Sequence, residues 1–468
     1  MKASDGRQTD VALSFVTTLA QLQQRARGFL DTFPDGFAQV GINWSVLRNF
    51  TILSGGSALG QGFSVALAPL IARLYLPDNI GQLGLFTAFI NVAVVAASLR
   101  YEFAIVSAET DREAAQLTLC SLVLGLPVST VAALTFFLMV RNGILGYGNM
   151  PLYAAILIMP ALLCTAAFSG LRYWLLRKER FSLISHGTVV QNVSRALSQA
   201  GFGWLGPNTV GLLAGEIIGR CSGMSRMLRA AWPALRRELA LSDLRQVKHT
   251  LIKNRQFALY SLPSSLLDTL AGSIALPLVV YVYGLNVGGS YSLLTRVLAV
   301  PAALITANVA DAFHSRAALI TQHNPLALPG LVKRMAGILL LIGICPAVVL
   351  VFFGPPLFQW VFGSKWLEAG LMATWVAPWF LAQFVVNPLS RVVLVVGRQE
   401  VKFIYDVITF GGTIAVFALA HHRQWPVLTA IAWLTVLKTV AYALFYFLLL
   451  NISSGHSQQA RPATEALQ

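Results

Sequence analysis

The chain has 468 residues, of which 56% are hydrophobic and only 11% are charged. A soluble domain is typically about 45–50% apolar and about 25% charged. A surface with so few charges cannot face water, so the composition excludes a soluble enzyme, a fibrous protein and a disulfide-rich secreted domain. The net charge of +15 would otherwise suggest a nucleic-acid partner. Here the basic residues cluster at the ends of apolar runs, where they indicate membrane orientation instead.

Twelve segments that are long enough to cross a membrane follow one another along the chain. In chain order they are 51–75, 81–99, 117–140, 152–170, 183–204, 209–227, 257–283, 291–309, 335–353, 371–396, 403–420 and 427–450. We therefore expect an all-α polytopic membrane protein. The fifth and sixth segments are the weakest, because they carry polar residues such as Gln191, Arg195 and Glu216. We interpret them as spans that face a bundle interior or a water-filled cavity. The alternative is a re-entrant or surface segment.

The distribution of basic residues predicts the orientation of these spans. Most of the 34 Lys and Arg residues fall on the side of the membrane that carries both termini. The opposite side holds Arg73, Arg141, Lys365 and Arg423. Because Lys and Arg accumulate in cytoplasmic loops, both termini are expected to be cytoplasmic.

An internal repeat is visible in the sequence. The segment that begins at Asn49 aligns without gaps to the segment that begins at Gln256, so that Phe50 meets Phe257. An offset of six spans preserves orientation, which predicts two six-helix parallel repeats around a central cavity. The corresponding parts are a cytoplasmic leader (1–46), an N-terminal six-helix lobe (47–230), a basic cytoplasmic linker (231–256), a C-terminal six-helix lobe (257–450) and a disordered cytoplasmic tail (451–468).

No motif for covalent chemistry is present. The sequence lacks HExxH, a Walker loop, GxSxG and a DxD pattern. The four cysteines are Cys120, Cys164, Cys221 and Cys345. They form no CxxC pair, so they indicate neither a metal site nor an obvious disulfide. We expect no enzymatic activity, no cofactor and no metal.

Charged residues at membrane depth are the candidate functional residues. The cations are Arg195, Arg296 and Lys438, and the acids are Asp268 and Glu216. Each is costly in lipid and therefore needs a partner or a polar ligand. If all face inward, the cavity is net positive and suits an anionic headgroup such as a phosphate. Pairing or snorkelling of each cation is the alternative.

The two acids have different expected roles. Glu216 and Arg220 are four residues apart, a spacing at which they can neutralise one another on one helix face. Asp268 aligns with the uncharged Gln61 in the repeat. It is a candidate for proton or ion coupling, with structural pairing to a cation as the alternative.

Two stretches of the sequence resemble a known family. The stretch FALYSLPSSLLDTLAGSIALPLVVYVYGLNVGGSYSLLTRVLAVPAALI (257–305) resembles the corresponding segment of Wzx-type lipid-linked oligosaccharide flippases. The stretch LRYEFAIVSAETDREAAQL (99–117) is similar to their first cytoplasmic loop. These polysaccharide biosynthesis proteins belong to the multidrug/oligosaccharidyl-lipid/polysaccharide exporter superfamily. The resemblance extends over residues 47–450.

The resemblance implies a V-shaped pair of six-helix bundles that alternates between inward- and outward-open states in the bacterial inner membrane. The implied cargo is an undecaprenyl-diphosphate-linked oligosaccharide repeat unit for lipopolysaccharide O-antigen, capsule or exopolysaccharide. Membrane lipid and the polymerase and chain-length proteins of the same pathway are the expected partners, and nucleic acid is not.

The family's site roles are transferred here on charge and depth alone. Substrate binding is assigned to Arg195, Arg296 and Lys438, and ion coupling to Asp268 and Glu216. One alternative function is a Na⁺- or H⁺-coupled drug or metabolite exporter of the same superfamily. Another is an integral-membrane polymerase, ligase or acyltransferase.

Overall fold

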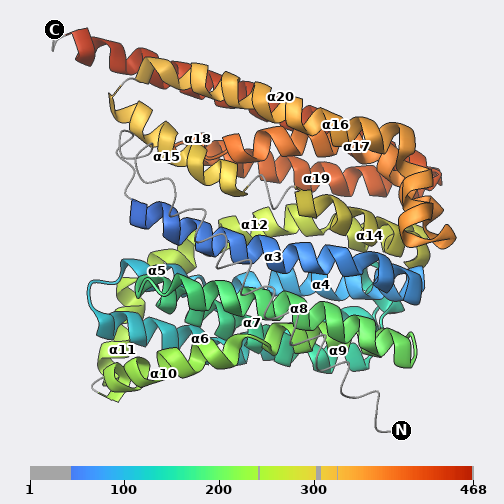
Figure 1. Cartoon of the computed structure of the whole chain (residues 1–468), viewed down its shortest axis with the longest axis horizontal. Helices are drawn as coiled ribbons and strands as arrows, with labels where there is room; N and C mark the ends of the chain where they lie inside the picture. Colours follow the sequence, from blue (N-terminus) through green and yellow to red (C-terminus); the bar gives the residue numbers. More distant parts are fainter. Residues whose placement is uncertain (1–43, 241–242, 302–306, 324, 466–468) are drawn as a thin grey trace.

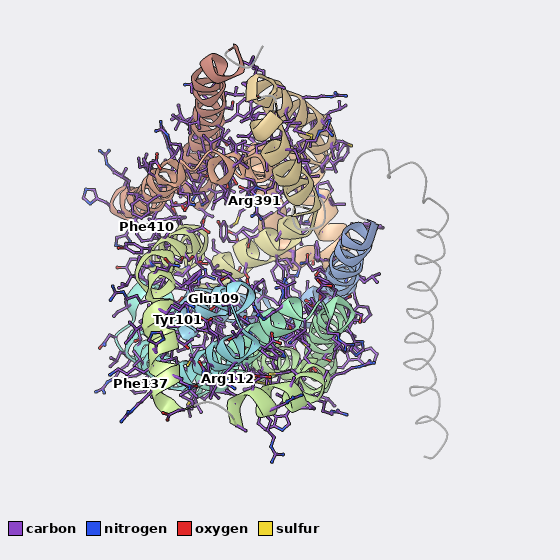
Figure 2. All side chains as sticks on the ribbon, turned by 90° about the vertical axis from the view of Figure 1, so that its left-hand side faces the viewer. Tyr101, Glu109, Arg112, Phe137, Arg391 and Phe410 are labelled. Carbon is purple, nitrogen blue, oxygen red and sulfur yellow. A yellow bond between two sulfur atoms is a disulfide. The ribbon has the colours of Figure 1, made fainter. Side chains whose placement is uncertain are left out.

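The structure is a computed structural model that describes residues 44–240, 243–301, 307–323 and 325–465. Every regular element in these ranges is helical. The long helices run side by side, with the first helices of the chain in the lower half of Figure 1 and the last in the upper half. Figure 2 views the molecule from the end that carries Tyr101 and Arg391.

The helices form two groups joined by a helical linker. The N-terminal group comprises α3 (Trp44–Leu74), α4 (Pro77–Ala97), α5 (Tyr101–Ser107), α6 (Asp111–Arg141), η1 (Ile144–Asn149), α7 (Tyr153–Arg177), α8 (Phe181–Leu205) and α9 (Thr209–Cys221). The linker contains α10 (Met224–Ala240) and α11 (Leu244–Lys253). The C-terminal group comprises η2 (Phe257–Ser261), α12 (Leu262–Ser273), α13 (Ala275–Tyr283), α14 (Leu285–Pro301), α15 (Ala307–His323), η4 (Pro325–Ala327), α16 (Leu328–Phe362), η5 (Ser364–Trp366), α17 (Leu367–Leu389), α18 (Val392–Val395), α19 (Gln399–Arg423) and α20 (Val427–Glu465).

Nine helical segments in the described ranges are long and apolar enough to cross a membrane. They coincide with nine of the twelve predicted spans, and the chain is a multi-pass membrane protein. The other three predictions fall on α8, α9 and α14. Of these, α9 has 13 residues and α14 has 17, and α8 lacks the apolar composition of a span. Twelve spans and the six-plus-six repeat therefore stay predictions.

The two aligned segments of the repeat differ in local structure. The first is part of α3, a single helix of 31 residues. The second begins with the π-helical turn η2 and continues as α12 and α13. Pro263, at the start of α12, has no N–H to donate. A single π turn accommodates such a disruption, and π turns are frequent at functional sites.

Glycines allow α3 and α8 to pack closely. A Cβ on Gly56 would lie 1.8 Å from the Ser185 hydroxyl oxygen, and a Cβ on Gly60 would lie 3.1 Å from the Asn192 amide nitrogen. The Ser64 hydroxyl donates to the Asn192 carbonyl at 3.3 Å. Close approach through small residues is the usual way in which helices associate in a membrane.

Glycines also bring the two helix groups together, where α4 meets α14. A Cβ on Gly289 would lie 1.9 Å from the Pro77 carbonyl oxygen, and a Cβ on Gly81 would lie 2.5 Å from the Leu285 carbonyl oxygen. These contacts lie at the beginning of both helices. The backbones therefore touch at the end of the molecule opposite to Tyr101.

At this same end the two groups exchange hydrogen bonds through Arg73, Lys365 and Trp366, which we call the end latch. The Arg73 guanidinium donates to the last carbonyls of α16 at 2.7 and 3.2 Å. In return, the Lys365 ammonium donates to two carbonyls at the end of α3, at 2.6 and 2.9 Å. The Trp366 indole donates to a third, at 2.9 Å. Each group thus supplies donors to helix-terminal carbonyls that have no partner within their own helix.

The linker is docked on the N-terminal group. The α10 helix buries Met227, Ala231 and Leu235. The Thr250 hydroxyl of α11 donates to the Gln116 side chain at 2.7 Å. Lys253 donates to Glu109 at 2.9 Å, which raises the pKa of Lys253 above its ordinary value.

The two ends of the chain are described in part. The α20 helix extends into the predicted tail 451–468 as far as Glu465. Of the predicted leader 1–46, residues 1–43 lie outside the described ranges.

Candidate functional site

A cavity of about 570 Å³ lies between the two helix groups. The N-terminal group contributes α4, α8 and α9 to its wall, and the C-terminal group contributes α12, α13, α14 and α17. The charged residues that line it are Arg195, Glu216, Arg220 and Arg296. Three cations against one carboxylate leave the cavity net positive.

Glu216 connects two of the cations. Its carboxylate accepts from Arg220, one turn later on α9, at 3.0 Å. It lies 3.8 Å from the Arg195 guanidinium of α8. The Glu216 side chain is only 4% exposed. The carboxylate therefore holds both guanidiniums in place without neutralising them completely.

Further hydrogen bonds orient the two paired arginines. Arg195 donates to the Asn192 side chain at 2.6 Å, and Arg220 donates to the Thr165 hydroxyl of α7 at 3.0 Å. Arg296 on α14 has no ion-pair partner among the residues that the structure describes. Its guanidinium is thus available to a ligand in the cavity.

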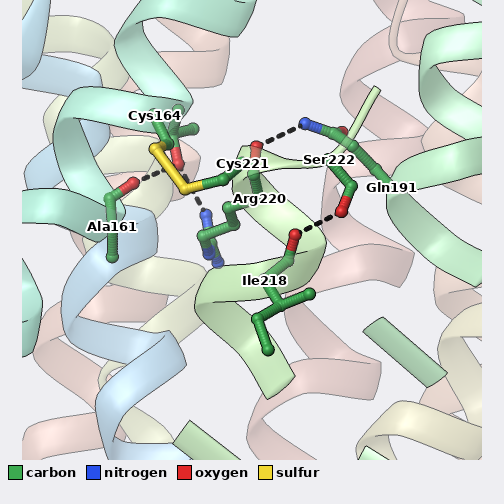
Figure 3. Close-up of a disulfide and its surroundings, with 8 residues drawn as sticks. Ala161, Cys164, Gln191, Ile218, Arg220, Cys221 and Ser222 are labelled. Atoms are coloured by element: carbon green, nitrogen blue, oxygen red, sulfur yellow. Dashed lines mark hydrogen bonds between the residues drawn. A yellow bond between two sulfur atoms is a disulfide. The ribbon is translucent and has the colours of Figure 1, made fainter. Parts of the chain in front are cut away.

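A disulfide lies directly beside this network. Cys164 of α7 and Cys221 of α9 are bonded, with 5.3 Å between their Cα atoms (Figure 3). The adjacent Arg220 carbonyl accepts from Gln191 of α8 at 3.0 Å. The sequence indicated no obvious disulfide, because the pairing joins residues that are far apart in the chain and become neighbours only when α7 and α9 pack together.

Lys438 and Asp268 do not line the cavity and belong to a second polar cluster. Lys402 of α19 donates to Asp268 of α12 at 2.6 Å and to both carboxylate oxygens of Asp406 at 2.9 Å. Lys438 of α20 is buried and donates to the Ala271 carbonyl of α12 at 3.5 Å. This cluster joins three helices of the C-terminal group. The expected gathering of Arg195, Arg296 and Lys438 in one site therefore does not occur.

Sequence reasoning overlooked Lys402 and Asp406. Lys402 lies just outside the predicted span 403–420, although α19 begins at Gln399. Asp406 lies within that span. Their spacing could have identified them, because a Lys and an Asp four residues apart at the start of an apolar helix are spaced for an ion pair.

The architecture and the cavity together define a polytopic membrane protein with a charged interior site between two helix groups. The family model for "Polysaccharide biosynthesis protein" matches residues 70–370. The chain belongs to this family. No curated protein matches the sequence.

Solved structures share the fold. An inward-facing multidrug resistance MATE family transporter of the MOP superfamily is 16% identical, with a TM-score of 0.64, covering 84% of this chain and 95% of that chain. The lipid II flippase MurJ, in an inward closed conformation, is 12% identical, with a TM-score of 0.65, covering 87% of this chain and 90% of that chain. A MOP superfamily transporter from Pyrococcus furiosus is 15% identical, with a TM-score of 0.57 and coverage of 87% and 96%.

Proposed function

We propose that the protein is a flippase that moves undecaprenyl-diphosphate-linked oligosaccharide repeat units across the bacterial inner membrane for surface polysaccharide biosynthesis. The observation that carries the proposal is the net-positive cavity between the helix groups of a polysaccharide biosynthesis protein. Guanidinium groups bind phosphate oxygens in a planar, two-pronged geometry. Among the described cavity residues, Arg296 has a guanidinium free of ion pairs, and we assign it the first contact with the diphosphate.

In this proposal the protein works by alternating access and performs no covalent chemistry. The glycan and diphosphate pass through the cavity while the polyprenyl tail stays in lipid. Both termini are cytoplasmic, so the end latch closes the periplasmic side. The structural likeness to a lipid II flippase supports this cycle. The O-antigen, capsule and exopolysaccharide pathways, with their polymerase and chain-length proteins, are the candidate contexts.

The second polar cluster is the proposed site of ion coupling. Asp268 and Asp406 carry two carboxylates around Lys402, with Lys438 nearby on α20. Protonation of one carboxylate would weaken the ion pairs that join α12 to α19. We assign ion coupling to the cluster that contains Asp268. Glu216 has a different proposed role, which is to balance part of the positive charge in the cavity.

The test is the leaflet location of the lipid-linked oligosaccharide together with surface glycan, in a deletion strain complemented with variants. We expect deletion to trap the intermediate on the inner leaflet, and Arg296→Ala to reproduce that defect. The matched control is Arg423→Ala, an exposed arginine at the end of α19. An intermediate on the outer leaflet would overturn the flippase. Unchanged glycan with altered drug resistance would instead favour the ion-coupled exporter.

A further inference from the structure

Besides its charged residues, the cavity is lined by uncharged residues from both helix groups. On α17, Trp379 and Gln383 are four residues apart and both line the cavity. On α4, Asn91 lines it from the other group. A tryptophan and two amides carry no charge, so this part of the cavity does not select for an anion or a cation.

The two amides are free to bind a ligand. Neither Asn91 nor Gln383 forms a hydrogen bond with another residue in the described ranges, although both side chains line the cavity. By contrast, Arg195 and Arg220 both pair with Glu216. A primary amide offers two donor hydrogens and an acceptor oxygen. Such a group matches a ligand whose neighbouring atoms both donate and accept, as the adjacent hydroxyls of a sugar do.

Trp379 supplies an aromatic surface in the same cavity as these amides. Its ring is half-buried and packs against two hydrophobic cores, which fix its position. Its indole nitrogen has no hydrogen-bond partner among the described residues. Tryptophan presents a large apolar face together with one polar group. The face of a pyranose ring is lined by C–H groups and packs on such a surface, while its hydroxyls point outward to polar partners.

We infer that Trp379, Gln383 and Asn91 form a subsite for the neutral sugar residues of the cargo, in the same cavity as the guanidiniums that take the diphosphate. This inference rests on the proposed function and adds specificity to it. A few placed polar groups in a mainly apolar pocket are the usual basis of ligand orientation. Variation at these three positions would therefore change which glycan is moved, whereas variation at Arg296 would affect every diphosphate-linked cargo.

The test compares two probes on the purified full-length protein in lipid nanodiscs. One is undecaprenyl diphosphate, and the other is the same lipid carrying the repeat unit, isolated from a strain that lacks the protein. We expect the wild type to bind the glycosylated lipid more tightly. Trp379→Leu and Gln383→Leu should each weaken binding of the glycosylated lipid about tenfold and leave binding of bare undecaprenyl diphosphate unchanged. Arg296→Gln should weaken both.

Matched controls separate a binding defect from a folding defect. Trp375→Leu removes a tryptophan one turn earlier on α17, which is 50% exposed and does not line this cavity. It should bind both probes like the wild type. If Trp379→Leu does not fold, Gln383→Leu and Asn91→Leu carry the test, since neither residue has a described hydrogen bond to lose.

The outcomes distinguish the two levels of the proposal. If the variants keep the wild-type preference for the glycosylated lipid, or if the wild type has no such preference, the sugar subsite is overturned and the flippase stands. If the wild type binds neither lipid, the proposed function itself is overturned.

Discussion

Glu216 is the one carboxylate among the charged residues that line the described cavity, and it is almost completely buried. A buried charge is tolerated only when it is paired and hydrogen-bonded. The two guanidiniums stabilise the buried Glu216 carboxylate, and the carboxylate in turn holds both guanidiniums in position. The positions of Arg195 and Arg220 thus depend on Glu216, although this carboxylate would not itself attract an anionic cargo.

We expect Glu216→Gln to lower the free energy of unfolding by up to about 3 kcal/mol, because two half-buried guanidiniums lose the buried carboxylate that pairs with them. Thermal unfolding of the purified protein measures the effect. The matched control is Glu400→Gln, whose carboxylate is 56% exposed and 3.5 Å from Arg398. Exposed pairs contribute at most about 1 kcal/mol. Equal stability of the two variants would contradict the structural role of Glu216.

Part of the site could be predicted from single residues. Arg195, Arg296 and Glu216 were selected by charge within predicted spans, and the structure places all three at one cavity. The Glu216–Arg220 ion pair was also predicted, and it is present. The positions of Lys438 and Asp268 were not predictable, because both depend on how α12 packs against α19 and α20, which lie far from α12 in the chain.

At the scale of the helices, length and apolarity identified nine membrane-spanning segments, including α4 and α17 of the cavity wall, but not the three helices that carry the charged residues of the cavity. The predicted spans that do not qualify by length and apolarity coincide with α8, α9 and α14. These helices carry Arg195, Glu216 and Arg296. The α9 and α14 helices fall short in length and α8 falls short in apolarity, and neighbouring helices can shield their charged residues from lipid.

The contact between α7 and α9 gives a prediction about cysteine chemistry. We expect an alkylating reagent, applied to the protein unfolded in denaturant so that every free thiol meets water, to label Cys120 and Cys345 and to leave Cys164 and Cys221 unlabelled until a reductant is added. Mass spectrometry of the peptides measures this pattern. Cys120 and Cys345 are the internal controls, since both are free thiols. Labelling of both paired cysteines without reductant would show that the disulfide is absent.

The contact between α4 and α14 gives a second prediction at this scale. We expect Gly289→Ala to destabilise the protein by about 1–3 kcal/mol and to reduce export, because the added Cβ would meet the Pro77 carbonyl at 1.9 Å. Surface glycan and thermal unfolding measure the two effects. Gly411→Ala on α19 is the matched control, since nothing lies within 4 Å of its Cβ position. A neutral Gly289→Ala would show that the two helices are not in close contact.

At the scale of the whole molecule, the end latch joins the two helix groups through donors to backbone carbonyls. The Arg73 and Lys365 side chains bond to helix ends instead of to carboxylates. Opening this end would expose those carbonyls, and water can replace the donors there. The latch is therefore suited to a contact that forms and breaks, in contrast to the buried ion pairs of the cavity.

We expect the double variant Arg73→Met and Lys365→Met to shift the population toward a state in which this end is open. Asp78 of the N-terminal group and Leu367 of the C-terminal group are both exposed, so each can carry a spin label. Opening of this end would lengthen the distance between the two labels. Arg141→Met, at the end of α6 and exposed, is the control and should leave the distances unchanged. Unchanged distances in the double variant would exclude a gating role for the latch.

The polar composition of α8, α9 and α14 also bears on how the chain is made. A central arginine adds about 2.5–3.5 kcal/mol to the cost of inserting a helix into a bilayer. These helices are therefore poor candidates for independent insertion during synthesis. We expect each to enter only beside apolar helices already in place, α3 for α8 and α4 for α14, so that the cavity is completed late in membrane assembly. The charges that would serve transport thus make the helices around the cavity depend on the rest of the chain for their entry into the bilayer.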